Sequence, residues 1–363
     1  MSITDAKKLT VAPLVCKKKR AENGEAPFIW IHRGSGAQMG FGHLKRCMVL
    51  AGELCDCARA FFVLRPEDRC SGEQLESQGF YWQNIEFSHL WRKPTVLPIL
   101  PAAILIDTRI SDGLDAFIQA ARENGVSVIS IHDMGLNPLY SDIAVDGSIA
   151  AAVQRDLLAR RIFTGTDYMV LDPAFHKSRR KPTRVVKEIR SIFIGLGGGD
   201  SRKYFSRVLE GIRLWAAKSE REVEVIGMRG FAEWGQEDFN IQNLHPLRFR
   251  WESGNAAGFL CSMDLAVTAG GISAYETLCS GVPLLALSWD SLQQTAIDSI
   301  EEAGACINLG LGDELTPEFL AAALDKTNGD AAARKKMARK GMELVDGRGA
   351  ERVAAIVRQT ISS

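Results

Sequence analysis

The sequence predicts an α/β protein made of two doubly wound domains, each a parallel sheet covered by helices. Apolar, strand-like runs alternate with helical segments along both halves of the chain, which is typical of parallel sheets. Three of these runs end in glycine-rich turns that lead directly into a helix. A basic segment punctuated by prolines divides the 363 residues into halves, each long enough to bury its own core.

The elements follow this alternation from one end to the other. A basic tail at 1–27 precedes a first domain at 28–172, with expected strands at 28–32, 59–64, 102–106 and 126–131 and helices at 42–55, 71–78 and 112–124. After the linker at 173–190, a second domain at 191–345 has expected strands at 192–196, 222–227, 264–268, 283–287 and 305–308 and helices at 201–218, 273–280, 292–303 and 316–326. The remaining segment, 346–363, carries a helix at about 350–361 that is able to cross back to the first domain.

The turn after the first strand carries the most informative motif, Gly-Phe-Gly-His-Leu-Lys-Arg at 40–46. Gly40 and Gly42 allow backbone N–H groups to line a tight loop, and the helix that follows directs its positive end toward an anion. His43 can act as a base near neutral pH, and Arg46 lies three residues on, on the same helix face. Packing alone can also produce such a turn, and the dinucleotide fingerprint is not met because Lys45 replaces its third glycine.

Two further turns of the same kind lie in the second half. The run at 264–268 is followed by Gly270 and Gly271 and then by a helix that begins near Ser273 and carries Glu276. A third turn follows 192–196, where Asp200 is an expected N-cap; its glycines are Gly197, Gly198 and Gly199. Three turns of this kind are hard to explain by packing alone.

These motifs, in this order, carry a family resemblance. The pattern resembles the nucleotide-sugar hydrolase of pseudaminic acid biosynthesis, is similar to the related spore-coat polysaccharide proteins, and is more distantly similar to the glycosyltransferase that completes lipid II. It covers residues 28–312 and consists of Gly40-x-Gly42-His43-x-x-Arg46, Gly197-Gly198-Gly199-Asp200, Ala269-Gly270-Gly271-x-Ser273-x-x-Glu276, Gly281-x-Pro283 and Gln293. Departures are Thr108-Arg109 after Asp107, Asp172 in place of a basic residue, and Ser273 in place of threonine, and they concern the identity of the sugar more than the fold.

The resemblance implies two Rossmann-like domains that face each other across a cleft, the GT-B architecture, and a UDP-sugar as substrate. It implies that His43 activates water and that Glu276 accepts from the ribose hydroxyls. The implied substrate contacts are Gly40, Gly42, Arg46, Asp107, Asp133 and Gln293, and the implied nucleotide contacts are Gly197, Gly198, Gly199, Gly270, Gly271, Ser273 and Glu276.

Several alternatives stay open. Ser273 and Glu276 have the spacing of a capping box, which is a purely structural role. Gln294 could replace Gln293 after a one-residue slip, and His132 with Asp133 could suggest a metal pair, although adjacent strand residues point to opposite faces. At the level of function, a glycosyltransferase and a noncatalytic nucleotide-sugar binding protein are the two rivals of a hydrolase.

Composition narrows the functional classes. Lys and Arg total 44, as do Asp and Glu, so no global field favours nucleic acid. The eight cysteines form no Cys-x-x-Cys pair, which argues against zinc and suits a reducing compartment. No export signal or membrane-spanning stretch is evident. We therefore expect a cytoplasmic, metal-independent enzyme without a cofactor, as a monomer or weak dimer.

Overall fold

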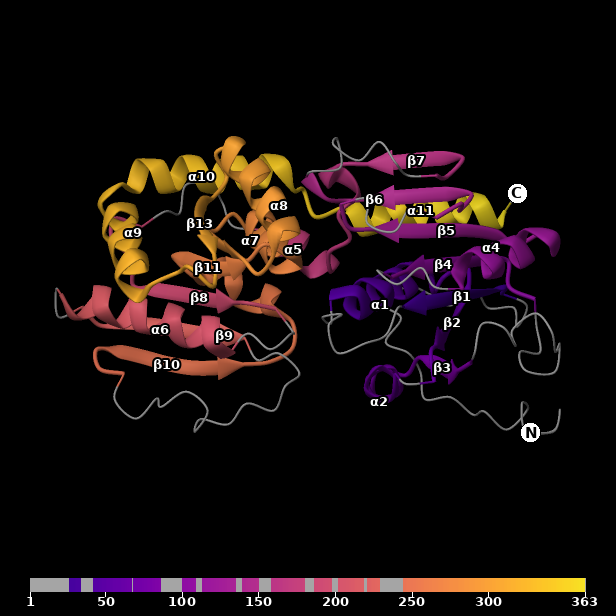
Figure 1. The fold of residues 1–363 in the computed structure, drawn as a ribbon, viewed down its shortest axis with the longest axis horizontal. Coiled ribbons are helices and arrows are strands. Elements are labelled where there is room, and N and C mark those ends of the chain that lie inside the picture. The colour runs from indigo at the N-terminus through magenta and orange to yellow at the C-terminus, as the bar shows by residue number, and fades with distance from the viewer. Residues whose placement is uncertain are drawn as a thin grey trace.

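The chain forms two parallel β-sheets, each covered by helices, in two domains that lie side by side (Figure 1). The computed structural model describes residues 26–33, 42–66, 68–85, 100–108, 113–134, 139–149, 158–179, 186–197, 202–218, 221–228 and 244–362. This architecture confirms the α/β class and the two doubly wound domains that the sequence predicts.

The first sheet has seven parallel strands in the order β3-β2-β1-β4-β5-β6-β7. Its strands are β1 (Phe28–Arg33), β2 (Arg59–Leu64), β3 (Tyr81–Asn84), β4 (Ala103–Asp107), β5 (Ser127–His132), β6 (Ile143–Asp146) and β7 (Arg161–Thr164). Its helices are α1 (Gly42–Leu54), α2 (Arg69–Ser77) and α4 (Leu114–Glu123). The winding direction reverses between β1 and β4, and such a switch point is where open parallel sheets bind ligands.

The second sheet has six parallel strands in the order β10-β9-β8-β11-β12-β13, and its switch point lies between β8 and β11. Its strands are β8 (Ser191–Gly195), β9 (Val223–Met228), β10 (Leu247–Glu252), β11 (Leu265–Ala269), β12 (Leu284–Ser288) and β13 (Ile307–Leu311). Its helices are α5 (Pro173–Lys177), α6 (Arg202–Ala217), α7 (Ile272–Ser280), α8 (Ser291–Glu302), α9 (Pro317–Gly329) and α10 (Ala331–Leu344).

Alternating side chains of β1 show how the first domain buries its sheet. Ile29 and Ile31 face a core shared with α1, whereas Trp30 faces the opposite core, which includes Phe117 of α4. This alternation is the period of two that a pleated strand imposes. Both faces are therefore covered, as a parallel sheet requires.

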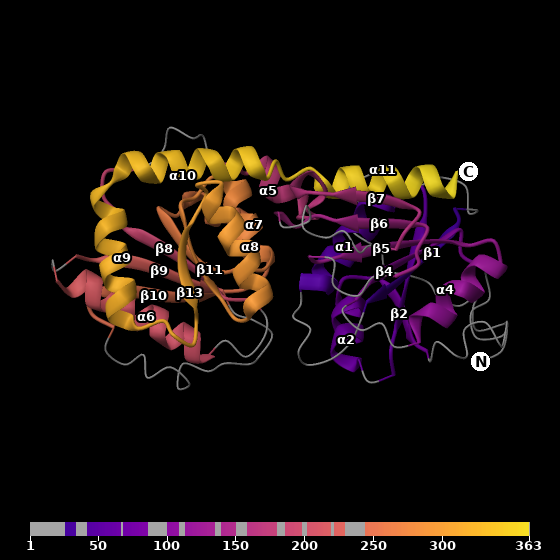
Figure 2. The same ribbon diagram turned by 45° about the horizontal axis from the view of Figure 1, so that its top comes forward.

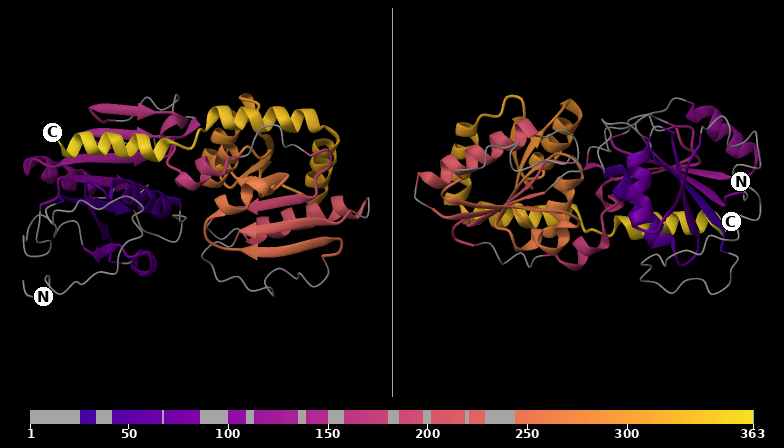
Figure 3. Two further views of the ribbon diagram at one scale, coloured as in Figure 1. Left: turned by 180° about the vertical axis from the view of Figure 1, so that it is seen from behind. Right: turned by 90° about the horizontal axis from the view of Figure 1, so that it is seen from below.

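The last helix, α11 (Gly349–Ile361), returns to the first domain. Figure 2 shows α10 and α11 running in line along both domains, and Figure 3 shows α11 lying against the first sheet from behind. Its apolar face joins the core formed by β1 and α1. Arg358 Nη2 donates to the carbonyl oxygen of Glu53 at 2.5 Å and to Asp56 Oδ1 at 3.1 Å.

The sequence analysis does not predict several of the observed elements. The strands β3, β6, β7 and β10 are not expected, nor is α10. β3 and β7 are short edge strands with partly exposed residues, and α10 is rich in basic residues, so each carries a weak apolar pattern. The segment 173–190 begins with α5, whose Phe175 is buried, and 1–25 lies outside the described residues.

Two further expectations concern cysteines and membranes. The thiols of Cys57, Cys261, Cys279 and Cys306 are free, but Cys55 is disulfide-bonded, which departs from the reduced state that the sequence favours. Within the described ranges, every helix is too short or too polar to cross a bilayer.

Candidate active site at the switch points

The strands of both sheets end where the two domains face each other, so both switch points lie at the interdomain boundary (Figure 1). In the first domain this edge carries the end of β4, at Asp107, and the first turn of α1. In the second domain it carries Gly197 after β8 and Gly270 after β11. The motifs found in the sequence therefore lie at the edges where parallel sheets bind ligands.

Four polar side chains form a cluster at the edge of the first domain. His43 Nδ1 lies 2.7 Å from Asp107 Oδ1, and Arg46 bonds the same carboxylate through Nε at 2.7 Å and Nη2 at 2.6 Å. Arg46 Nη1 also donates to Asp133 Oδ1 at 2.6 Å. The helical spacing of His43 and Arg46 and the ends of two adjacent strands bring this cluster together.

The contacts of His43 bear on which ring nitrogen carries the proton. A carboxylate can only accept a hydrogen bond, so the 2.7 Å contact to Asp107 Oδ1 favours a proton on Nδ1. Arg46 Nη2, which can only donate, also lies 3.1 Å from Nδ1, but it has a shorter bond of 2.6 Å to Asp107 Oδ1. In neutral imidazole the other nitrogen, Nε2, is then the basic one, and it lies 3.5 Å from Asp133 Oδ2. This arrangement can hold the ring in the tautomer that a general base requires.

Charge interactions keep both carboxylates of the cluster ionised. Burial alone would raise the pKa of Asp107, but the nearby Arg46 and His43 outweigh it and hold that pKa far below its usual value. Burial would also raise the pKa of Asp133, but the charges of Arg46 and then of His43 outweigh it and lower that pKa. Burial works against the charge of Arg46, yet Asp107 and Asp133 raise its pKa well above the ordinary value. Arg46 is 3% exposed and makes four hydrogen bonds to two carboxylates, so the cluster has no excess positive charge.

The turn after β5 fixes Asp133. Met134 has φ +58°, which is rare for a residue with a side chain. Its N–H donates to Ser148 Oγ at 3.3 Å, and Ser148 Oγ donates to Asp146 Oδ1 at 2.6 Å. Asp146 and Ser148 thus support the site, and the sequence analysis missed them because Asp146 ends a strand that it did not predict.

In the second domain, the start of α7 faces the start of α1. Gly271 occupies the N-cap position of α7, and no side chain caps this helix. A Cβ on Gly42 would lie 2.8 Å from Ile272 Cδ1, so the two helix N-termini are in close contact. Gly197 has φ +85°, and a Cβ on Gly270 would lie 2.9 Å from Ile297, so both positions favour glycine. Helix N-termini carry partial positive charge and attract anions.

The capping box considered for Ser273 and Glu276 is absent. Glu276 is buried, and its Oε1 accepts a hydrogen bond from Lys45 Nζ of α1 at 2.5 Å. Ser273 lies within the helix instead of capping it, close to Gly195 at the end of β8. Lys45 is a further residue of the candidate site that the sequence analysis missed, since nothing in the sequence relates it to a residue 231 positions away.

Gln293 takes part in the cap of α8. Asp290 Oδ1 accepts from the N–H of Gln293 at 2.8 Å, and Gln293 Oε1 accepts from the N–H of Trp289 at 3.2 Å. Its neighbour Gln294 bonds Ser288 and Asp298. The alternatives Gln293 and Gln294 thus both have structural contacts, while Gly40, Gly198, Gly199 and Asp200 lie outside the described residues.

Asp172 and His132 also have structural contacts. Asp172 caps α5 and accepts from Asn255 Nδ2 at 2.6 Å, and His132 Nε2 lies 2.6 Å from Ser130 Oγ. Asp133, in contrast, directly follows the end of β5 and joins the His43 cluster.

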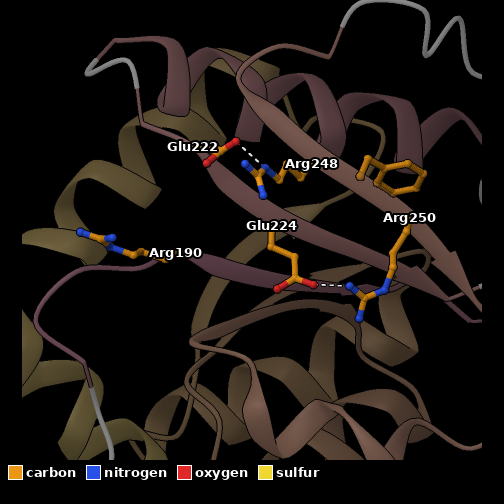
Figure 4. Close-up of a pocket in the computed structure, with 6 residues that line it drawn as sticks. Arg190, Glu222, Glu224, Arg248 and Arg250 are labelled. Carbon is orange, nitrogen blue, oxygen red and sulfur yellow. Dashed lines mark hydrogen bonds and ion pairs between the residues drawn. The ribbon is translucent and has the colours of Figure 1, made fainter.

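A surface hollow lies at the other end of the second sheet (Figure 4). It is lined by residues at or near the beginnings of β8, β9 and β10, and Glu222 pairs there with Arg248 and Glu224 with Arg250. The two pairs are each neutral, and the third arginine of the lining, Arg190, lies 3.8 Å from Glu188. Each arginine of the hollow thus has a carboxylate partner, and the hollow is remote from the strand ends that carry the cluster.

Comparison with known proteins places the chain among GT-B folds. No protein-family model matches it. It is 28% identical over 350 residues to the spore coat polysaccharide biosynthesis protein SpsG of Bacillus subtilis, which covers 91% of this chain and 97% of the relative. MurG of Acinetobacter baumannii superposes with a TM-score of 0.66 at 13% identity, over 92% of this chain and 99% of that one. A complex of S. aureus MnaA with UDP superposes with a TM-score of 0.62 at 12% identity, over 93% of this chain and 97% of that one.

Proposed function

We propose that this chain is a metal-independent hydrolase that cleaves a UDP-linked modified sugar, of the acetamido and deoxy kind, into free sugar and UDP. The observation that carries the proposal is the His43–Asp107 pair, which leaves a basic Nε2 at the meeting point of two helix N-termini. The UDP in the MnaA complex and the polysaccharide role in the name of SpsG support the substrate class. The pathway would then be bacterial surface-glycan or nonulosonic acid biosynthesis.

In the proposed reaction, water attacks the anomeric carbon of the sugar. His43 Nε2 takes a proton from the water as its oxygen forms a bond to that carbon. The bond between the carbon and the phosphate oxygen breaks, and its electron pair leaves with UDP. Asp107 holds the ring and stabilises the imidazolium that forms, and Asp133, near Nε2, can accept a hydrogen bond from the water.

The leaving group needs stabilisation more than it needs a strong acid. A nucleoside diphosphate already leaves easily, and the uncapped N-terminus of α7 presents backbone N–H groups and a partial positive charge. A pair of glycosidase-type carboxylates is therefore not required. Substrate contacts are proposed from Gly40, Gly42, Arg46, Asp107, Asp133 and Gln293, with Arg46 acting through the carboxylates that it holds. Nucleotide contacts are proposed from Gly197, Gly198, Gly199, Gly270, Gly271, Ser273 and Glu276.

Glu276→Gln should weaken UDP binding by roughly 1–3 kcal/mol, because two ribose hydroxyls would lose a charged acceptor. Calorimetric titration with UDP measures this change, and a melting curve shows whether the variant is folded. Glu210→Gln on α6, which breaks an ion pair with Arg213, is the matched control and should keep UDP affinity. If Glu276→Gln lowers only the melting temperature, Glu276 has no role in binding.

Activity should be the same in excess EDTA as in Mg²⁺, within about twofold, since no step uses a Lewis acid. The carboxylates nearest to the reaction, Asp107 and Asp133, are both held by Arg46 and not arranged around a cation. Turnover measured in both buffers checks this. Loss of turnover on chelation and recovery with Mg²⁺ or Mn²⁺ would contradict it, and Asp107 and Asp133 would then be the first candidate ligands.

A glycosyltransferase is the alternative that the site also permits, because His43 could deprotonate an acceptor hydroxyl instead of water. Incubation with a panel of UDP-sugars, with and without acceptors, separates the two when UDP release is followed by NMR. Release without an acceptor supports the hydrolase, and release that depends on an acceptor supports transfer. Binding without release would indicate a noncatalytic nucleotide-sugar binding protein.

A further inference from the structure

Lys45 connects the two domains at the centre of the site. Its Nζ donates to Glu276 Oε1 at 2.5 Å, so helix α1 of the first domain is tied to helix α7 of the second. The ammonium also lies 5.4 Å from the centre of the Phe175 ring. The Lys45 side chain is 34% exposed, whereas that of Glu276 is 7% exposed, so the lysine is the partner with room to move.

The carboxylate that Lys45 occupies is the one proposed to bind the ribose. Two ribose hydroxyls could take over the hydrogen bonds of Glu276, and in doing so they would displace the ammonium from it. In any nucleoside diphosphate the ribose is joined directly to the phosphates. A displaced ammonium would therefore have strong acceptors close by.

Arg46, the strong cation of the His43 cluster, cannot easily supply charge to a diphosphate. It makes four hydrogen bonds to Asp107 and Asp133. The two negative charges of these carboxylates already exceed its single positive charge. If it turned to a phosphate, it would leave two buried or half-buried carboxylates without their partner, which is costly. Lys45, in contrast, would give up only its hydrogen bond to Glu276 and would gain contact with the negatively charged diphosphate.

We propose that Lys45 binds the diphosphate, moving there from Glu276 when the ribose hydroxyls take its place. This inference rests on the proposed function and adds a residue to it. The lysine then serves both states of the site, because it neutralises Glu276 before binding and the phosphates afterwards. A positive charge on the phosphates also favours departure of UDP.

The test compares UDP with uridine, which has the ribose but no phosphate. In Lys45→Met the Kd for UDP should rise roughly tenfold to a hundredfold, as for loss of a hydrogen bond to a charged group. The Kd for uridine should stay the same or fall, because Glu276 no longer has a competitor. Lys45→Arg should retain most of the preference for UDP. Lys218→Met, which removes a similar pair with Asp325 at the far end of α6, is the control and should change neither constant.

A second variant keeps the test valid if Lys45→Met does not fold. Lys45→Gln retains a hydrogen-bond donor for Glu276 but has no charge, and it should show the same selective loss of UDP affinity. Equal weakening of UDP and uridine, or an unchanged UDP constant, would overturn the inference while the proposed function stands. Failure of the wild-type chain to bind either ligand would overturn both.

Discussion

His43→Ala should lower turnover of the UDP-sugar by roughly 10²–10⁴-fold, the usual cost of losing a general base. The affinity for UDP should change little, because the nucleotide is proposed to lie mainly on the second domain. UDP release followed by NMR gives the turnover, and calorimetric titration gives the affinity. A large loss of turnover at constant affinity is the pattern of a group that acts only in the transition state.

The control for this variant is His245→Ala, which changes an exposed histidine just before β10. It should keep normal turnover. If folded His43→Ala protein turned over substrate at nearly the normal rate, the assignment of the base would be wrong, and Asp133 would be the next candidate because it lies 3.5 Å from His43 Nε2.

Arg46→Met should destabilise the protein by about 3–5 kcal/mol near neutral pH, because it leaves buried Asp107 and the neighbouring Asp133 without their cation. Denaturant unfolding measures the difference from the wild type. Arg213→Met is the matched control, since it breaks a partly exposed pair with Glu210 and should cost only about 0–1 kcal/mol. A loss as small as that of the control would show that the Arg46 cluster contributes little to stability.

The penalty of Arg46→Met should also depend on pH. In the wild type the folded-state pKa values of Asp107 and Asp133 are lowered, so their contribution to stability persists down to about pH 4 and is lost below it. Without Arg46, the burial that raises the pKa of Asp107 is opposed by His43 alone, so we expect this pKa to lie above its unfolded value. The variant should then regain stability as the pH falls from about 7 to about 5, while the wild type changes little over this range.

The sequence predicts the parts of the site that depend on local rules. His43 and Arg46 share a helix face because of their spacing, and Asp107 and Asp133 meet them because parallel strands end at one edge of the sheet. The capping box considered for Ser273 and Glu276, in contrast, does not form. A related arrangement occurs instead at Asp290 and Gln293, whose N-cap aspartate has the same three-residue spacing.

The remaining features depend on tertiary structure. The contact of Lys45 with Glu276 depends on how the two domains are placed, and no local pattern encodes that. The left-handed backbone of Met134 is imposed by its surroundings, including Ser148, because methionine itself disfavours it. Edge strands such as β7 carry exposed residues and thus lack the continuous apolar run that marks central strands.

The return of α11 to the first domain bears on the order in which the chain can assemble. A ribosome delivers the first domain before the second, and domains generally fold as they emerge. Here, however, five buried residues of the first core, at positions 350, 353, 354, 356 and 357, belong to the final helix. The first domain to be synthesised is therefore completed only after the second, and the edge of the first sheet built on α1 gains its full support only once the second domain exists.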